Sequence, residues 1–359
     1  GNQLVSGFYP NRIPNPDLKW EKTGQFDIGF DLGLFNNRLR LTADYYYKKT
    51  TDLLYNVAIP SASGYDSMLK NIGSVQNKGY ELSIESDNLS GAFSWTTAFN
   101  ISFNRNKVLE LGGETYKDVG TYDDHLKTSD IRRLIVGQPI GVFYGYRFDG
   151  IFQNEAECAQ QTSSPSPIGV GLRRYKDLNG DGKIDATNDR EILGDANPKF
   201  FGGMTNTFAY KGFELNVFLQ YSYGNKIFNY NAMELESPTG GQNVYQDLVN
   251  RWTPTNPSNE YQKATTNRNN IVSDRFIEDG SFLKLKTVSL SYSFPKLNWK
   301  HIGGLRLYVT GQNLLTWTKY RGYDPEVSYR GASTLEAGED FGGYPQARTF
   351  MFGIKLDIK

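Results

Sequence analysis

One stretch of the chain carries oxygen-bearing side chains at alternate positions around a glycine. Its candidate cation ligands are Asp177, Asn179, Asp181, Lys183 through its carbonyl, Asp185 and Asp189. Alternate positions of a tight loop converge on one point, and Gly182 permits the sharp turn, so the spacing indicates Ca²⁺ in the 177–189 loop. The twelfth position is Asn188, where a bidentate Glu is usual, and Asp189 or Glu191 would have to replace it. The alternative is an Asn-Gly/Asp-Gly double turn without a metal.

Other residues that could perform covalent chemistry are few. Cys158 is the single cysteine, and the nearer of two histidines is His125, with no motif that places them together. The paired carboxylates at 278–279 and 339–340 sit at loop ends, where solvated charges are expected rather than general acid–base catalysis. We therefore assign no catalytic residue and predict that the chain is not an enzyme.

Aromatic residues in the long loops are the best candidates for ligand contact, because flat rings suit sugar faces and peptide side chains. They are Tyr65, Tyr122, Tyr230, Tyr245, Trp252, Tyr261, Tyr323 and Tyr344. The same rings could instead pack the loops together or against a lid protein. The sequence does not rank them, so the substrate-binding residues are unknown at this point.

The composition excludes several classes of protein. The 359 residues include 39 basic and 39 acidic side chains, so there is no basic footprint for nucleic acid. Mean hydropathy is −0.55, and no apolar run reaches the roughly 20 residues that a membrane helix needs. Aromatic residues make up 14% of the chain, which fits both a membrane β-barrel and a soluble sugar-binding β-protein.

Period-2 alternation is the dominant pattern that would position these residues. Residues 350, 352, 354, 356 and 358 are apolar, whereas Lys355, Asp357 and Lys359 lie on the opposite face. The same alternation recurs in about ten stretches, including 26–34, 38–48, 93–104, a run near 141–152, and 213–221. Strands with one apolar and one polar face predict an antiparallel sheet with lipid on one side and water on the other. Near 283–294 the alternation changes phase, which predicts a bulge at Lys286 or Thr287.

The connections fall into two length classes. Short turns are expected near 36–37, 87–91, 211–212 and 295–303, and long connections at 49–76, 105–140, 153–199, 222–275 and 317–345. Short and long connections alternate along the chain, so a meander would place all the long loops on one rim. Outer-membrane barrels have this asymmetry, with the long loops outside, whereas a soluble sandwich has no reason for it.

Several segments, in order along the chain, resemble SusC/RagA-like TonB-dependent transporters. They are Asn15-Pro-Asp-Leu-Lys-Trp-Glu21, Gly137-Gln-Pro-Ile-Gly-Val-Phe-Tyr-Gly145, Asp149-Gly-Ile-Phe152, Tyr175-Lys-Asp-Leu-Asn-Gly-Asp-Gly-Lys-Ile-Asp185, Asn197-Pro-Lys-Phe200, Leu305-Arg-Leu-Tyr-Val-Thr-Gly-Gln-Asn-Leu-Leu315 and Gly322-Tyr-Asp-Pro-Glu326. Each motif is weak alone, but together they are specific.

The resemblance implies a plugged outer-membrane barrel of about 22 strands. Residues 1–359 would be its C-terminal portion, with the plug and about twelve upstream strands on a companion chain or segment. It also implies a bacterial outer-membrane location, active import of oligosaccharides or oligopeptides, energy from the TonB system acting on the plug, and a SusD-like surface lipoprotein as lid. Membrane lipid would contact the outside, and nucleic acid is not expected.

Two alternatives remain open from the sequence. A ten-stranded outer-membrane hydrolase would explain the strand number without a companion segment, but it requires a catalytic cluster in the outer loops. A soluble glycan-binding β-protein would bury its apolar face between two layers, so Phe99, Ile101, Phe352 and Ile354 would then be core residues.

Overall fold

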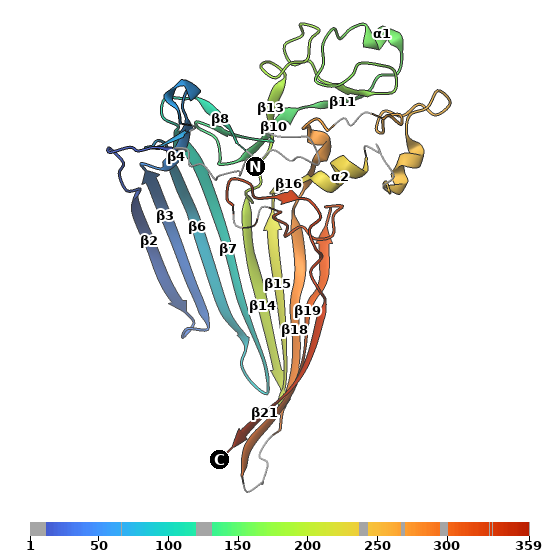
Figure 1. Cartoon of the computed structure of the whole chain (residues 1–359). Helices are drawn as coiled ribbons and strands as arrows, with labels where there is room; N and C mark the ends of the chain where they lie inside the picture. The colour runs from blue at the N-terminus through green and yellow to red at the C-terminus, as the bar shows by residue number, and fades with distance from the viewer. Residues whose placement is uncertain are drawn as a thin grey trace, which may run out of the picture.

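In a computed structural model, the chain forms one large curved sheet with a layer of loops at one end (Figure 1). The structure describes residues 12–65, 67–119, 131–236, 243–266, 270–294, 301–329, 331 and 333–358. No helix within these ranges is long and apolar enough to cross a membrane.

The large sheet is an antiparallel meander. Its nine strands, in spatial order, are β2 (Lys22–Leu34), β3 (Leu39–Thr51), β6 (Ser74–Leu89), β7 (Phe93–Glu110), β14 (Phe200–Tyr210), β15 (Phe213–Tyr223), β18 (Phe282–Ser293), β19 (Ile302–Thr318) and β21 (Thr349–Ile358). Every strand pairs with its neighbour along this order, as the alternating sequence predicted. The count is nine rather than about ten, because the run at 141–152 belongs to the loops.

The register aligns apolar residues from strand to strand. One continuous row crosses eight strands through Leu32, Leu41, Ile84, Phe99, Met204, Leu219, Leu285 and Leu315. We call the side that carries this row the apolar face. The neighbouring row crosses all nine strands through Gly33, Arg40, Glu85, Ala98, Thr205, Phe218, Thr287, Gln312 and Thr349. We call its side the polar face.

Hydrophobic side chains on the apolar face are exposed, whereas a soluble sandwich would bury them between its two sheets. Phe352 is 82% exposed and Ile354 is 68% exposed on the apolar face. Among the buried hydrophobic residues of the described ranges, only Val108 lies in the nine-stranded sheet. Phe99 and Ile101 are partly exposed as well, so none of the four residues is buried by the described part of the chain, contrary to the sandwich alternative.

Two local predictions about the strands are confirmed. Between Leu285 and Thr287 the register of β18 against β15 shifts, which leaves Lys286 as the extra residue of a bulge. This bulge restores the apolar phase of the second half of the strand. The turn between β2 and β3 uses left-handed backbone at Phe35, Asn36 and Asn37, with φ of 54°, 56° and 62°.

Short and long connections alternate around the sheet. The short ones, including 35–38, 90–92 and 211–212, lie at the lower end in Figure 1, and the long ones gather at the upper end. The run at 141–152 is not a tenth wall strand, so 111–199 is a single long connection. The strict alternation of length that a barrel requires is therefore present.

The long connections carry small elements of their own, which we call the loop layer. Its sheets are β1 (Arg12–Ile13) with β5 (Ser67–Asn71) and β4 (Leu54–Ala58); β13 (Arg190–Gly194), β10 (Val142–Tyr146), β9 (Arg132–Ile135) and β8 (Tyr116–Val119); β11 (Phe148–Ile151) with β12 (Arg173–Tyr175); and β17 (Ile277–Asp279), β16 (Lys226–Asn229) and β20 (Glu339–Asp340). Its helices are α1 (Glu155–Cys158), α2 (Tyr230–Leu235) and the 3₁₀ turns η1 (Ser61–Ser63), η2 (Gln246–Asn250) and η3 (Asp274–Phe276).

The main hydrophobic core lies in this loop layer. Phe143, Phe228, Met233 and Phe276 are fully buried there and come from connections that are far apart in the sequence. Burying a side chain of this size contributes about 1.5–3 kcal/mol. The loops are therefore folded against one another.

Candidate functional site: the polar face and the loop layer

The polar face is a wall of paired polar side chains. The guanidinium of Arg40 lies 2.9 Å from the carboxylate of Glu85, and the hydroxyl of Thr42 donates to Asp31 at 2.6 Å. Further along the sheet, the guanidinium of Arg306 donates to Glu214 at 2.6 Å. These contacts suit a surface that faces water inside a pore.

The last long connection folds onto the loop end of this wall. Lys284 on β18 is 2% exposed, and its ammonium lies 2.6 Å from Asp324 and 2.5 Å from Glu326. Glu326 also accepts from Lys286 at 3.1 Å and from Gln220 at 2.9 Å. Burial alone would raise the pKa of Glu326, but the hydrogen bond and charge of Lys284 and then Lys286 hold that pKa below its ordinary value. The connection is thus fastened to the wall by charge.

A largely buried ionic network joins the last long connection to the connections at 111–199 and 224–281. We call it the rim network; its members are Arg132, Arg173, Glu236, Arg275, Glu278, Arg321 and Glu339. Glu236 lies at its centre, with Arg275 at 2.7 Å, Arg321 at 3.2 Å and Arg173 at 4.0 Å. Arg132 and Glu339 form a second ion pair, which does not contact Glu236 directly. Their charged groups are 2.9 Å apart, and both side chains are almost fully buried. Each contact joins segments far apart in the chain, so the network positions one long connection relative to another.

The acidic pair at 339–340 was expected to be solvated, and that expectation is wrong. Both residues are 2% exposed, Glu339 pairs with Arg132, and Asp340 accepts a hydrogen bond from the Tyr320 hydroxyl. Burial, and then the hydrogen bond and charge of Asp340, raise the pKa of Tyr320 above its usual range. These carboxylates are structural partners in an ionic core.

The 177–189 loop is organised by its own hydrogen bonds. Asp177 accepts from the amides of Gly180 at 2.6 Å and Gly182 at 2.7 Å. Asp189 is fully buried and accepts from the amides of Leu178 and Asp185, each at 2.8 Å. These contacts are those of the double turn that the sequence allowed as an alternative.

The remaining predicted ligands are more open. Asn179 and Asp181 are exposed and bond to each other at 3.0 Å, Asp185 caps the amides of residues 187 and 188, and Lys183 donates its amide to Asp181. Glu191 is engaged elsewhere, by Arg147. Within the described ranges, no group of three or more His, Cys, Asp or Glu side chains is close enough to hold a metal. Calcium binding by this loop stays a prediction.

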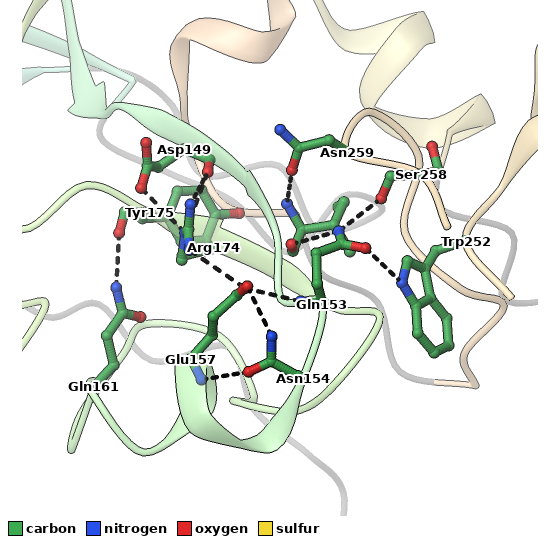
Figure 2. A network of polar contacts seen from close by, with 11 residues as sticks. Asp149, Gln153, Asn154, Glu157, Gln161, Arg174, Tyr175, Trp252, Ser258 and Asn259 are labelled. Carbon is green, nitrogen blue, oxygen red and sulfur yellow. Dashed lines mark hydrogen bonds and ion pairs between the residues drawn. The ribbon is translucent and has the colours of Figure 1, made fainter. Parts of the chain in front are cut away.

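A second polar cluster fastens the part of the loop layer that contains α1 (Figure 2). Asn154 caps α1 by accepting from the amide of Glu157 at 2.9 Å, and the Glu157 carboxylate lies 3.4 Å from the guanidinium of Arg174. The side-chain carbonyl of Gln153 accepts a hydrogen bond at 3.1 Å from the indole of Trp252, which lies in the next long connection. The Ile151 amide donates to Asn259 at 3.0 Å.

The predicted ligand-contact aromatics fall into different environments. Tyr230 and Tyr261 are buried packing residues, and Tyr65, Tyr245 and Trp252 are half-buried. Tyr323 is 83% exposed and Tyr344 is 91% exposed, whereas Tyr122 lies outside the described residues. Two rings outside that set, Tyr116 and Tyr144, line a cavity in the loop layer. The sequence gives no signal for these two rings, because only the pairing of strands in the loop layer brings them together around one cavity.

The single cysteine has an environment unlike that of a nucleophile. Burial, followed by the charges of Glu155 and Glu157, raises the pKa of the Cys158 thiol, whereas a reactive cysteine needs a lowered pKa. His125, its only sequence-based candidate base, lies outside the described residues.

Comparison with known proteins identifies the family of the chain. The family model described as "TonB dependent receptor-like, beta-barrel" matches residues 1–314. The chain belongs to this family of TonB-dependent receptors. As a member of this family, it is an outer-membrane protein, which confirms the predicted location.

Relatives show how much of a receptor this chain represents. It is 41% identical over 365 residues to TonB-dependent receptor P3 of Formosa agariphila, a match that covers 99% of this chain and 36% of that receptor. It is 29% identical to TonB-dependent receptor SusC of Bacteroides thetaiotaomicron, covering 96% of this chain and 32% of SusC. A structure of the RagAB peptide transporter superposes with a TM-score of 0.78 at 27% identity, covering 96% of this chain and 36% of that one. The chain thus spans about a third of these receptors, and its sheet is part of a barrel.

Proposed function

We propose that this chain forms part of the wall and outer loops of an outer-membrane importer of oligomeric nutrients. The observation that carries the proposal is the sheet itself, with a continuous apolar row on one face and a neighbouring row on the polar face, and with the long connections of its strands folded into a loop layer at one end. Such a wall separates lipid from an aqueous lumen. Its similarity to SusC and to the RagAB transporter supports import over a hydrolytic barrel.

The importer requires partners beyond this chain. We propose that the plug and the remaining strands belong to a companion segment or chain, that the TonB system acts through the plug, and that a SusD-like lipoprotein covers the loop layer. The cargo is an oligosaccharide or an oligopeptide. The polar face needs no covalent chemistry for this role, because passage depends on weak, exchangeable contacts.

An uptake assay tests the proposal. Cells lacking the complete receptor should lose uptake of labelled oligomers of one class, and an uncoupler that collapses the proton-motive force should abolish the same uptake in wild-type cells. Unchanged uptake of both labelled oligosaccharides and labelled oligopeptides in the deletion strain would contradict import. Release of hydrolysis products by the purified receptor would favour the hydrolase instead.

A further inference from the structure

A cavity of about 500 Å³ opens beside the four-stranded sheet of the loop layer. Every strand of that sheet contributes to its wall: Tyr116 and Asp118 from β8, Arg133 from β9, Tyr144 from β10 and Arg190 from β13. Thr187 adds a hydroxyl group from the 177–189 loop. The volume falls within the roughly 300–1,000 Å³ that is typical of small-ligand sites.

The wall of the cavity is a layered stack. The guanidinium of Arg133 lies 3.9 Å from the ring centroid of Tyr116 and 3.9 Å from that of Tyr144. Arg190 lies 5.1 Å from the Tyr144 ring. Cation–π contacts with both rings hold the Arg133 guanidinium in place. The ligand would therefore meet a surface that is already ordered, which lowers the entropy lost on binding.

Asp118 completes the wall and compensates the charge of Arg133. It accepts from Arg133 through both carboxylate oxygens, at 2.6 and 2.9 Å, in the fork-to-fork arrangement. Arg133 is 8% exposed, whereas the Asp118 side chain is 33% exposed, so the carboxylate stays accessible from the cavity. The positive charge of Arg133 is thus compensated within the site, so this residue does not require an anionic ligand.

The Tyr116 ring remains half exposed, at 49%. A flat apolar ring next to fixed donors and acceptors matches a sugar, whose C–H face is apolar and whose equatorial hydroxyls both donate and accept.

We propose that this cavity is a subsite for one unit of a neutral oligosaccharide, stacked on Tyr116 with hydroxyls bonded to Asp118 and Arg133. The proposal rests on the proposed import function and specifies its cargo as a glycan. The subsite holds the sugar at the outer end of the polar face, before entry into the lumen.

Binding by the complete receptor, purified in detergent, tests the subsite. The wild type is screened against an array of neutral and acidic oligosaccharides and, in parallel, against a pool of hexapeptides, and affinities for hits are measured by calorimetry. We expect a neutral oligosaccharide to bind, Tyr116→Ala to weaken it by about tenfold or more, and Tyr116→Phe to retain most of the affinity. Arg133→Lys should also weaken binding, because it loses the bidentate fork and the planar stack.

The matched control is Tyr210→Ala, which removes a tyrosine of similar exposure, 46%, that lies outside the cavity next to the short turn after β14. It should bind as the wild type does, and circular dichroism should show that all variants are folded. Failure of every oligosaccharide to bind, binding of peptides alone, or wild-type affinity in Tyr116→Ala would overturn the subsite. Import itself would fail differently: the sugar would bind the purified receptor, but deletion of the receptor would leave cellular uptake unchanged.

Discussion

The ammonium of Lys284 lies 2.6 Å from the carboxylate of Asp324, and both side chains are more than nine-tenths buried. One residue belongs to a strand of the wall and the other to the last long connection, so the pair fixes that connection over the mouth of the polar face. A buried ion pair is strongly destabilised when one partner is removed, because the other charge is left uncompensated.

Replacement of Lys284 by Met should therefore release the last connection. Loss of one partner of a buried pair costs about 3–5 kcal/mol, partly offset here because Lys286 still contacts Glu326. We expect limited proteolysis to cut 319–348 much faster in the variant, while the sheet stays assembled as judged by heat-modifiable migration. Lys355→Met removes an exposed lysine on β21 and should not alter the cleavage rate. Equal rates for all three proteins would show that the pair does not hold the connection.

The same contact should depend on pH through Glu326. Its pKa is lowered in the folded protein, so its contribution to stability is complete above the ordinary glutamate pKa of about 4.3 and is lost as pH falls through the lower folded value. Pepsin cleavage within 319–348 should rise sharply below about pH 4. In Glu326→Gln that additional rise should be absent, and a variant with the wild-type profile would exclude Glu326 as the titrating group.

The 177–189 loop gives a prediction about calcium. The oxygen spacing predicts one bound Ca²⁺ that rigidifies the loop, and Asp181→Ala should abolish the binding because it removes a ligand position. Calorimetric titration of the complete receptor with Ca²⁺, after treatment with a chelator, measures both proteins. A wild-type titration without heat, together with unchanged proteolysis of the loop, would leave the double turn as the full explanation.

The two faces of β7 give a prediction about membrane assembly. Phe99 belongs to the apolar row and Ala98 to the polar row, one residue away. An arginine on the lipid side of a barrel costs about 2–4 kcal/mol at the membrane midplane, whereas at position 98 it would face Glu85. Phe99→Arg should thus reduce the amount of folded receptor in outer-membrane fractions, and Ala98→Arg should not. Equal yields would contradict the assignment of the faces.

Sequence patterns were sufficient for the wall but not for the loop layer. The alternation in 26–34, the left-handed turn at Asn36 and Asn37, and the bulge at Lys286 are local signals, because strand period and turn chemistry act between near neighbours. The run at 141–152 also alternates, yet it divides into β10 and β11, which pair within the loop layer. Periodicity identifies a strand but does not name its partner.

The buried contacts of the loop layer lie beyond local sequence signals. Arg132 and Glu339 are separated by 207 positions, and a charged residue at a loop end ordinarily faces solvent. The alternation of polar residues alone would also allow Arg40 to pair with Asp31 on β2. The strand register instead places Arg40 beside Glu85 on β6. Such partners are determined by tertiary packing.

The separation of lipid from water by one sheet is the central claim, and spin-label accessibility measures it directly. Single cysteines at Leu82, Ser83, Ile84 and Glu85 of β6, in a cysteine-free background that includes Cys158→Ser, carry nitroxide labels in the membrane-reconstituted receptor. Labels at 82 and 84 should collide with oxygen and those at 83 and 85 with a water-soluble nickel complex, in strict alternation. If 82 and 84 were shielded from both reagents, or if all four sites ranked alike, the apolar face would not lie in lipid and the account would be wrong.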